Sequence, residues 1–500
     1  MTTERHSDDI QPGSVVNPMH RRLAFSSLIM GGSNIVKAGV QLVSLPLIAR
    51  FLGPAEYGLY GLAMPAVLLM LTIADSGLGA SLARESEDQV DIWSSAFWFV
   101  NISGVVLAAG LSGASFIMAR VTHEPRLPPI MMSLSLCLVF LTFTVTSNAR
   151  LTRQGRMGVN SVGEALGTIL GAATAIGLAL KGAGTWSLVA QTLITFGLRA
   201  GFVFAAAPFI PKFHFSLKDL RSHLRVGGSI LGSRLVATGG KTAESTLIVR
   251  LATTNFLGVY SFANQAPMYI CETISNALWA VLYSQGVLTQ DDAVIQRTYN
   301  AVVRVFALSV FPTVVLIAAQ AHALVLDLLG PHWLPAVPIM QILLVTYAIA
   351  VSGTFGSALL YARGKTFIQL QIVIEAAILR IICVAALPWI GILGMAICLG
   401  AINVYFGTRS IFSVQKYLGY KAIPQIRVVM APAAASLIAG LLSWYIGTQT
   451  PASIWWTILN MALCALVYGI VLALTEYQAV INDIVSLRRL MGRNKNVQAT

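Results

Sequence analysis

Fourteen apolar runs, each of about 20 residues or more, fill most of this 500-residue chain and constrain its fold more than any other feature. Backbone in hydrocarbon must satisfy its own hydrogen bonds, and the alternation typical of a membrane β-barrel is absent, so each run predicts a transmembrane helix. The sequence therefore predicts an all-α membrane protein with spans at 23–49, 58–82, 92–119, 128–149, 160–181, 184–207, 224–251, 256–284, 298–328, 334–361, 366–388, 391–413, 425–447 and 452–475.

Charged residues are scarce and unevenly placed. Only 11% of the residues are charged, whereas a soluble protein has about 25%, so most of the surface is expected to face lipid. With both termini in the cytoplasm, the cytoplasmic segments hold 22 of the Lys and Arg residues and the outside segments hold five. This positive-inside distribution fixes the orientation and accounts for the net charge of +13 without a nucleic-acid partner.

One stretch of the chain occurs twice. LIARFLGPAEYGLYGLA begins at Leu47 and LIVRLATTNFLGVYSFA begins at Leu247, and ten of the 32 positions in 32–63 are identical to those in 232–263. Six spans separate the copies, which gives both halves the same orientation, as in parallel repeats related by a pseudo-two-fold axis along the membrane normal. Gly58 and Gly258 are equivalent in this repeat and are expected to allow close helix contact.

The repeat predicts two six-helix lobes around a central cleft, plus an extra helix pair. The expected divisions are a cytoplasmic N-terminal tail (1–22), an N-lobe (23–207), a cytoplasmic linker (208–223), a C-lobe (224–413), the extra pair (425–475) and a cytoplasmic C-terminal tail (476–500). Gly53-Pro54 is expected to break the first span, because Pro suits the first turn of the next helix. Two lobes beside a cleft are the architecture of alternating access.

Three stretches resemble bacterial oligosaccharide flippases, the polysaccharide transporter branch of the multidrug/oligosaccharidyl-lipid/polysaccharide (MOP) exporter superfamily. They are LIARFLGPAEYGLY, IADSGLGASLARE and LVLDLLGPHWLPAVPIMQIL, and the span count and the repeat agree over nearly the whole chain. The resemblance implies a transporter of the bacterial inner membrane, not an enzyme. It implies that the substrate is a lipid-linked oligosaccharide, moved to the outer leaflet on undecaprenyl pyrophosphate, and that a polysaccharide polymerase and co-polymerase are partners.

Six cations fall inside predicted spans, where charge is costly and marks functional positions by default. Polar residues follow one face of span 23–49 and the equivalent face of span 224–251. If both faces meet at the cleft, their cations can bind a pyrophosphate. Lys would act as a point charge, and Arg would donate two parallel hydrogen bonds. The candidate substrate-binding residues are Lys37, Gln41, Arg234, Lys241, Arg304 and Arg380, whereas Arg199 is expected to serve helix packing or to face lipid.

Several of these cations also have a structural interpretation. Lys241 and Glu244 are three residues apart and could form an ion pair within one helix. Arg380 and Glu375 are five apart, which places them roughly 140° apart around the helix, so Arg380 needs a partner on another helix or in the cleft. Arg304 lies near the inner end of its span and could extend to the membrane surface.

Carboxylates inside the spans are candidates for ion coupling, since coupled transport needs a group that binds a proton or a sodium ion. The candidates are Asp75, Glu164 and Glu272. For Asp75, which lies towards the inner end of its span, a helix-end or packing role is the alternative. The sequence leaves the coupling ion open.

Other functions have signatures that this sequence lacks. It contains no glycine-rich phosphate loop, zinc-ligand spacing or nucleophile elbow, so we expect no cofactor and no metal site. A membrane polymerase or acyltransferase usually needs a larger outside loop than the stretch 119–129 offers. The closer alternatives are a lipid II flippase and a drug/cation antiporter of the same superfamily, and the cationic faces would repel a cationic drug.

Overall fold

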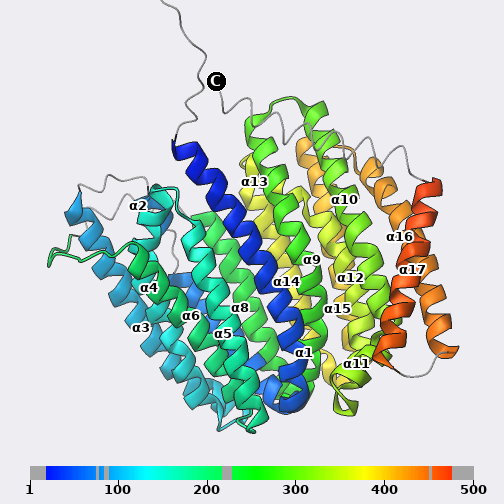
Figure 1. Cartoon of the computed structure of the whole chain (residues 1–500), viewed down its shortest axis with the longest axis horizontal. Coiled ribbons are helices and arrows are strands. Elements are labelled where there is room, and N and C mark those ends of the chain that lie inside the picture. Colours follow the sequence, from blue (N-terminus) through cyan, green and yellow to red (C-terminus); the bar gives the residue numbers. More distant parts are fainter. Residues whose placement is uncertain (1–17, 75–77, 84–88, 217–227, 450–452, 476–500) are drawn as a thin grey trace, which may run out of the picture.

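The computed structural model describes residues 18–74, 78–83, 89–216, 228–449 and 453–475, and the regular structure within them is entirely helical. Long helices stand side by side, with the first lobe at one end of the row and the last two helices at the other (Figure 1). The first lobe comprises α1 (Pro18–Ala74), α2 (Leu78–Leu82), α3 (Val90–Thr122), α4 (Leu127–Arg153), α5 (Gly158–Leu180) and α6 (Trp186–Ala206).

The second lobe begins with α8, which is equivalent to the first half of α1 in the repeat. It comprises α8 (Gly228–Leu251), α9 (Thr254–Leu288), α10 (Asp292–Ala319), α11 (Ala321–Leu328), the 3₁₀ helix η1 (Pro331–Trp333), α12 (Ala336–Thr354), α13 (Gly356–Ala362), α14 (Thr366–Ala385) and α15 (Leu387–Leu418). The extra pair is α16 (Ala422–Gln449) and α17 (Ile454–Thr475). It packs on the outer side of α10 through Leu316, Ala435 and Cys464.

The predicted spans are all found among these helices. Eleven helices in the described ranges are long and apolar enough to cross a membrane. One of them, α1, contains two predicted spans, because Gly53 breaks it with φ 73° and ψ 168°, where the Gly53-Pro54 pair predicts a break. Helices α8 and α9 coincide with the predicted spans 224–251 and 256–284. With them, all fourteen predicted spans have a matching helix.

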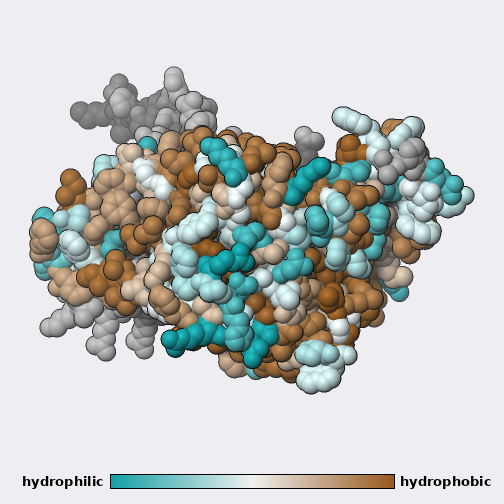
Figure 2. All heavy atoms as spheres, turned by 90° about the horizontal axis from the view of Figure 1, so that it is seen from below, coloured by the Kyte–Doolittle hydropathy of each residue, from teal (hydrophilic) through white to brown (hydrophobic). Residues whose placement is uncertain are grey.

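The outer surface of the helix row is apolar. On α3, Ile102 and Val106 are 55% and 63% exposed, and on α17 Leu466 is 65% exposed. Seen from below, polar side chains gather across the middle of the molecule while hydrophobic ones occupy its flanks (Figure 2). Side chains of this kind are stable on a protein flank only where lipid surrounds it, so the chain is a multi-pass membrane protein.

The two lobes touch backbone to backbone at the repeated glycines. A Cβ atom added to Gly58 would lie 1.9 Å from the carbonyl oxygen of Thr254, and one added to Gly258 would lie 1.8 Å from that of Pro54. Position 54 is the repeat equivalent of position 254, so the contact is symmetric. The close approach expected at these glycines is thereby confirmed, and no side chain fits between the helices here.

Polar side chains surround this contact beside the break in α1 at Gly53. The indole nitrogen of Trp333 donates to the carbonyl oxygen of Ala49 at 3.1 Å, and Nη1 of Arg50 donates to that of Asp327 at 3.1 Å. The hydroxyl of Tyr57 donates to Oε1 of Gln265 on α9. Trp333 is fully buried. These bonds join the first lobe to the second at the end predicted to face the outside.

We expect Gly58→Ala to destabilise the protein, because its new Cβ would collide with the backbone oxygen of Thr254, which cannot move alone. Overpacking of a tight site costs about 1–3 kcal/mol or more, so the unfolding temperature in detergent should fall by about 1–3 °C or more for a chain of this length. Gly110→Ala on α3 is the matched control, since a Cβ there meets nothing within 4 Å. Equal unfolding temperatures for the two variants would contradict the assigned contact.

Candidate functional site

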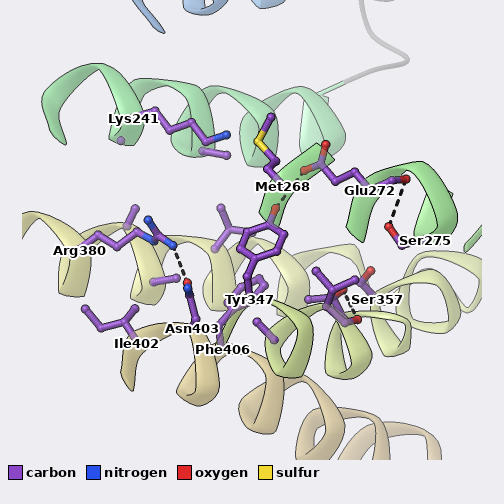
Figure 3. Close-up of a pocket in the computed structure, with 18 of the residues that line it drawn as sticks. Lys241, Met268, Glu272, Ser275, Tyr347, Ser357, Arg380, Ile402, Asn403 and Phe406 are labelled. Atoms are coloured by element: carbon purple, nitrogen blue, oxygen red, sulfur yellow. Dashed lines mark hydrogen bonds between the residues drawn. The ribbon is translucent and has the colours of Figure 1, made fainter. Parts of the chain in front are cut away.

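A cavity of about 530 Å³ lies wholly within the second lobe, and we call it the C-lobe cavity. Its lining comes from helices α8, α9, α12, α13, α14 and α15 (Figure 3). Its polar lining residues are Lys241, Glu244, Asn264, Glu272, Ser275, Asn276, Trp279, Tyr347, Thr354, Ser357, Arg380 and Asn403. The fold thus brings three of the sequence candidates, Lys241, Glu272 and Arg380, to one cavity.

Arg380 is the centre of a polar network in this cavity. Its Nη1 lies 3.5 Å from Oε2 of Glu244 on α8, and its Nη2 donates to Oδ1 of Asn403 on α15 at 2.6 Å. The Tyr260 hydroxyl donates to the other oxygen of Glu244. Glu244 is only 5% exposed, and a carboxylate so deeply buried requires a charged or hydrogen-bonded partner. The network therefore joins α8, α9, α14 and α15 through one ion pair.

This network settles the two pairing questions raised by the sequence. Arg380 finds its partners on other helices, as its distance from Glu375 around α14 predicts, and Glu375 pairs instead with Arg409 at 3.2 Å. Glu244 is occupied by Arg380, so the alternative of an ion pair between Glu244 and Lys241 within α8 is wrong. The i,i+3 spacing allowed that pair, but a guanidinium on the facing helix takes the carboxylate.

Lys241 is therefore left with its charge unpaired. Its side chain extends from α8 over the C-lobe cavity (Figure 3). Within the described part of the chain, its ammonium has no carboxylate within 4.0 Å and no hydrogen bond. An unpaired ammonium exposed to a cavity can bind an anion without first breaking a protein contact.

Glu272 lies across the cavity on α9. Its Oε1 accepts a hydrogen bond from the Tyr347 hydroxyl of α12 at 3.1 Å. This carboxylate is half-buried and has no basic partner within 4.0 Å among the described residues. A carboxylate held by a neutral phenol keeps the capacity to take up a proton or a cation.

In the first lobe, two sequence candidates bind each other. Nζ of Lys37 on α1 lies 3.1 Å from Oε1 of Glu164 on α5, with the two side chains 18% and 34% exposed. The sequence predicts that Lys37 binds substrate and that Glu164 binds an ion. The ion pair between Lys37 and Glu164 therefore has to break before Lys37 can bind a substrate or Glu164 can bind an ion.

Gln41 lines a second, smaller cavity of about 220 Å³, which we call the interlobe cavity. Its walls come from α1, α5 and α6 of the first lobe and from α9 of the second. The C-lobe cavity lies on the other side of the same α9, which contributes Gln265 and Tyr269 to one cavity and Met268 and Glu272 to the other.

The remaining candidates line neither cavity. Arg234 is exposed on α8, and Arg304 is half-buried on α10. Asp75 lies outside the described residues. Arg199 donates through Nε to Oδ1 of Asn160 at 2.8 Å, a contact between α6 and α5 that is in keeping with the expected packing role.

Sequence reasoning missed Tyr260, Tyr347 and Asn403. Each is an uncharged polar residue within an apolar span, and each is hydrogen-bonded to a charged side chain of the C-lobe cavity. Similar residues recur in many of the spans, so polarity alone does not single them out. Only the packing of α9, α12 and α15 around the charges does.

Two helical lobes whose membrane-spanning helices line polar cavities form the fold of a membrane transporter. The structure is similar to that of the lipid II flippase MurJ in an inward closed conformation, with a TM-score of 0.72 over 91% of this chain and 100% of that chain at 12% identity. It is also similar to an inward-facing multidrug resistance MATE family transporter of the MOP superfamily, with a TM-score of 0.57 over 79% of this chain and 98% of that chain at 15% identity.

Within this class, residues 47–338 match the family model described as polysaccharide biosynthesis protein, and the chain belongs to that family. It is 23% identical to the succinoglycan biosynthesis transport protein ExoT of Rhizobium meliloti, over 88% of this chain and 90% of that protein. It is 21% identical to the lipopolysaccharide biosynthesis protein WzxC of Escherichia coli, over 68% of this chain and 70% of that protein. It is 22% identical to the teichuronic acid biosynthesis protein TuaB of Bacillus subtilis, over 65% of this chain and 68% of that protein.

A double-mutant cycle tests the ion pair in the C-lobe cavity. Glu244→Ala should leave the Arg380 guanidinium without its counter-charge and destabilise the protein. The loss is expected between the ~1 kcal/mol of an exposed pair and the 3–5 kcal/mol of a fully buried one, because Arg380 is partly open to the cavity. Glu244→Ala combined with Arg380→Ala should be less destabilised than the sum of the single variants. Additive shifts in the unfolding free energy would show that the pair does not form.

Proposed function

We propose that this protein is a flippase that moves undecaprenyl-pyrophosphate-linked oligosaccharide repeat units from the inner to the outer leaflet of a bacterial inner membrane. Family membership supports the substrate class, since relatives are named for the biosynthesis of succinoglycan, lipopolysaccharide and teichuronic acid. The observation that carries the proposal is the unpaired Lys241 ammonium in the C-lobe cavity. It suits the anionic pyrophosphate that such a substrate presents.

The Lys241 ammonium is the group of this cavity that can bind an anion, whereas the Glu272 carboxylate, which has no basic partner among the described residues, can take up a proton or a cation. Glu244 is held by Arg380 and Tyr260, so its negative charge is already compensated, whereas the Lys241 charge is not. A charge-assisted contact to one phosphate oxygen contributes about 1.5–3 kcal/mol. Removing it should therefore weaken headgroup binding roughly tenfold to a hundredfold.

Transport then follows by alternating access, with the two lobes moving as units. The symmetric glycine contact offers an axis for this motion, because it joins the lobes without interlocking side chains. The hydrogen bonds of Trp333, Arg50 and Tyr57 close the outer end. They have to separate for the headgroup to leave on that side.

We further infer that Glu272 is the better candidate for proton or sodium coupling. The Glu164 carboxylate is neutralised by Lys37, whereas Glu272 accepts a hydrogen bond from the neutral Tyr347. A coupling carboxylate has to change its charge state during the cycle, which a permanent counter-charge opposes. A polymerase and co-polymerase remain the expected partners that use the exported units.

Export should depend on the Lys241 charge. Lys241→Ala should abolish export or reduce it at least tenfold, because the headgroup loses its unpaired cation, whereas Lys241→Arg should retain partial function because the charge persists. The measurement is surface polysaccharide in a strain that lacks its own flippase, alongside membrane abundance. Lys181→Ala, at an exposed turn outside both cavities, is the control. Normal export by Lys241→Ala at normal abundance contradicts this headgroup contact.

The orientation can be tested by thiol labelling. We expect cysteines placed at Lys181 and Ala252, in exposed turns of the two lobes, to react with an impermeant reagent in intact spheroplasts. A cysteine at Lys365 should react only after permeabilisation, because the positive-inside rule assigns that turn to the cytoplasm. Labelling of only one of the two outside positions would overturn the parallel-repeat topology. The native Cys398 is replaced by Ser in all three variants, since it is exposed.

A further inference from the structure

A short non-helical segment, residues 208–216, follows α6 and runs beside α3 at the first-lobe end of the molecule (Figure 1). Its backbone is bonded to two serines of α3. The amide nitrogen of Lys212 donates to Oγ of Ser94 at 3.0 Å. That of Ser216 donates to Oγ of Ser95 at 3.1 Å. Both serines are fully buried, and through them α3 satisfies backbone groups that a loop at a membrane cannot leave unpaired.

Side chains of α3 and α4 hold the same segment in place. The indole nitrogen of Trp98 on α3 donates to the carbonyl oxygen of Lys212 at 3.0 Å. Nη1 of Arg150 on α4 donates to the carbonyl oxygen of Pro208 at 2.7 Å, and the guanidinium of Arg150 lies 6.0 Å from the centre of the Phe209 ring. The 208–216 segment is therefore a fixed part of the first lobe.

The outward side chains of this segment are large and apolar. Phe213 is 98% exposed and Ile210 is 86% exposed, and Phe215 is also exposed. One face of the Phe213 ring stacks on Trp98, with 5.6 Å between the ring centroids, and the rest of the ring is uncovered. Side chains of this size gathered on one exposed stretch indicate contact with lipid or with a partner.

The position along α3 places the segment at a membrane surface. Ser94 and Trp98, which bind it, follow Val90 at the start of α3 by four and eight residues. At 1.5 Å per residue, they lie about 6 and 12 Å along the helix axis from its first residue. The 33 residues of α3 span about 50 Å, whereas a bilayer with its headgroups is about 40–45 Å thick. These contacts therefore fall in the headgroup region, where tryptophan is enriched.

The charge of the segment suits the cytoplasmic leaflet. The positive-inside distribution assigns this end of the first lobe to the cytoplasm, and the cytoplasmic leaflet carries anionic lipids. Lys212 is exposed, and within the described part of the chain its ammonium has no carboxylate within 4.0 Å. An ammonium at this depth is available to the phosphate of a lipid.

We propose that the 208–216 segment is an anchor in the cytoplasmic leaflet. Its exposed apolar side chains insert among the acyl chains, and Lys212 binds the phosphate of an anionic phospholipid. This lipid is a resident of the membrane and not the transported substrate, because the segment lines neither cavity. The inference therefore does not rest on the flippase function. Since the segment begins the chain that joins the two lobes, the anchor fixes that beginning to the first lobe and to one leaflet.

Lipid-specific quenching of a fluorophore on the segment tests this contact. The fluorophore is attached to Ile210→Cys in the full-length Cys398→Ser protein, in nanodiscs of equal parts phosphatidylcholine and phosphatidylglycerol. One of the two lipids carries a nitroxide quencher near its headgroup. We expect phosphatidylglycerol to be enriched about fivefold beside the segment, the effect typical of one Lys near an anionic surface. Dissolved iodide should quench this fluorophore much less than one attached to Lys181→Cys, in an exposed turn.

Lys212→Gln should lower the enrichment of phosphatidylglycerol at least twofold, because the charge is lost. Both hydrogen bonds of Lys212 use its backbone, so the variant keeps the segment in place. Lys181→Gln, which removes the same charge far from the segment, is the matched control and should leave the enrichment unchanged. Equal quenching by the two lipids, or an unchanged enrichment in Lys212→Gln, overturns the phospholipid contact. Iodide quenching as strong as at Lys181→Cys shows that the segment faces water or a soluble partner, and overturns the anchor.

Discussion

The backbone contact between Gly58 and Gly258 is the constraint on which the arrangement of the two lobes depends. At this point α1 and α9 approach so closely that neither helix tolerates a Cβ atom. Dispersion forces between closely packed backbones are a main source of helix association in lipid, where the hydrophobic effect offers no gain. Because the helices meet here, Tyr57 reaches Gln265 and Trp333 reaches Ala49. The interlobe cavity is the space that opens between the same helices beyond this contact.

Charge in the membrane interior is the second constraint, and it explains the polar networks. Glu244 and Glu164 are each held by a cation from another helix, Arg380 and Lys37 respectively. An unpaired carboxylate at such positions would be costly. Lys241 and Glu272 differ from these residues, because neither has a partner of opposite charge within 4.0 Å among the described residues, and the function proposed above assigns an anion to Lys241.

Sequence patterns predicted the spans, the helix break at Gly53 and the glycine contact, because each is determined by local composition or by the repeat. The candidate charges were also visible, since any charge within an apolar run stands out. Their pairing was not predictable, because Lys37 and Glu164 come from different helices whose facing sides depend on tertiary packing. The same reason explains why the alternative of a Lys241–Glu244 pair stayed open in the sequence, since spacing within one helix carries no information about Arg380 on α14. Cavities formed by four or more helices leave no local pattern at all.

The glycine contact also bears on how the chain arose. Gly58 touches Thr254 while Gly258 touches Pro54, the reciprocal pattern of an isologous interface between identical subunits. Such an interface is what a homodimer of a six-helix protein would have before its gene was duplicated and fused. In a homodimer every substitution appears in both halves, whereas fusion lets the halves diverge. A difference of this kind separates the equivalent positions Gln41 and Lys241, of which one lines an uncharged cavity and the other a charged one.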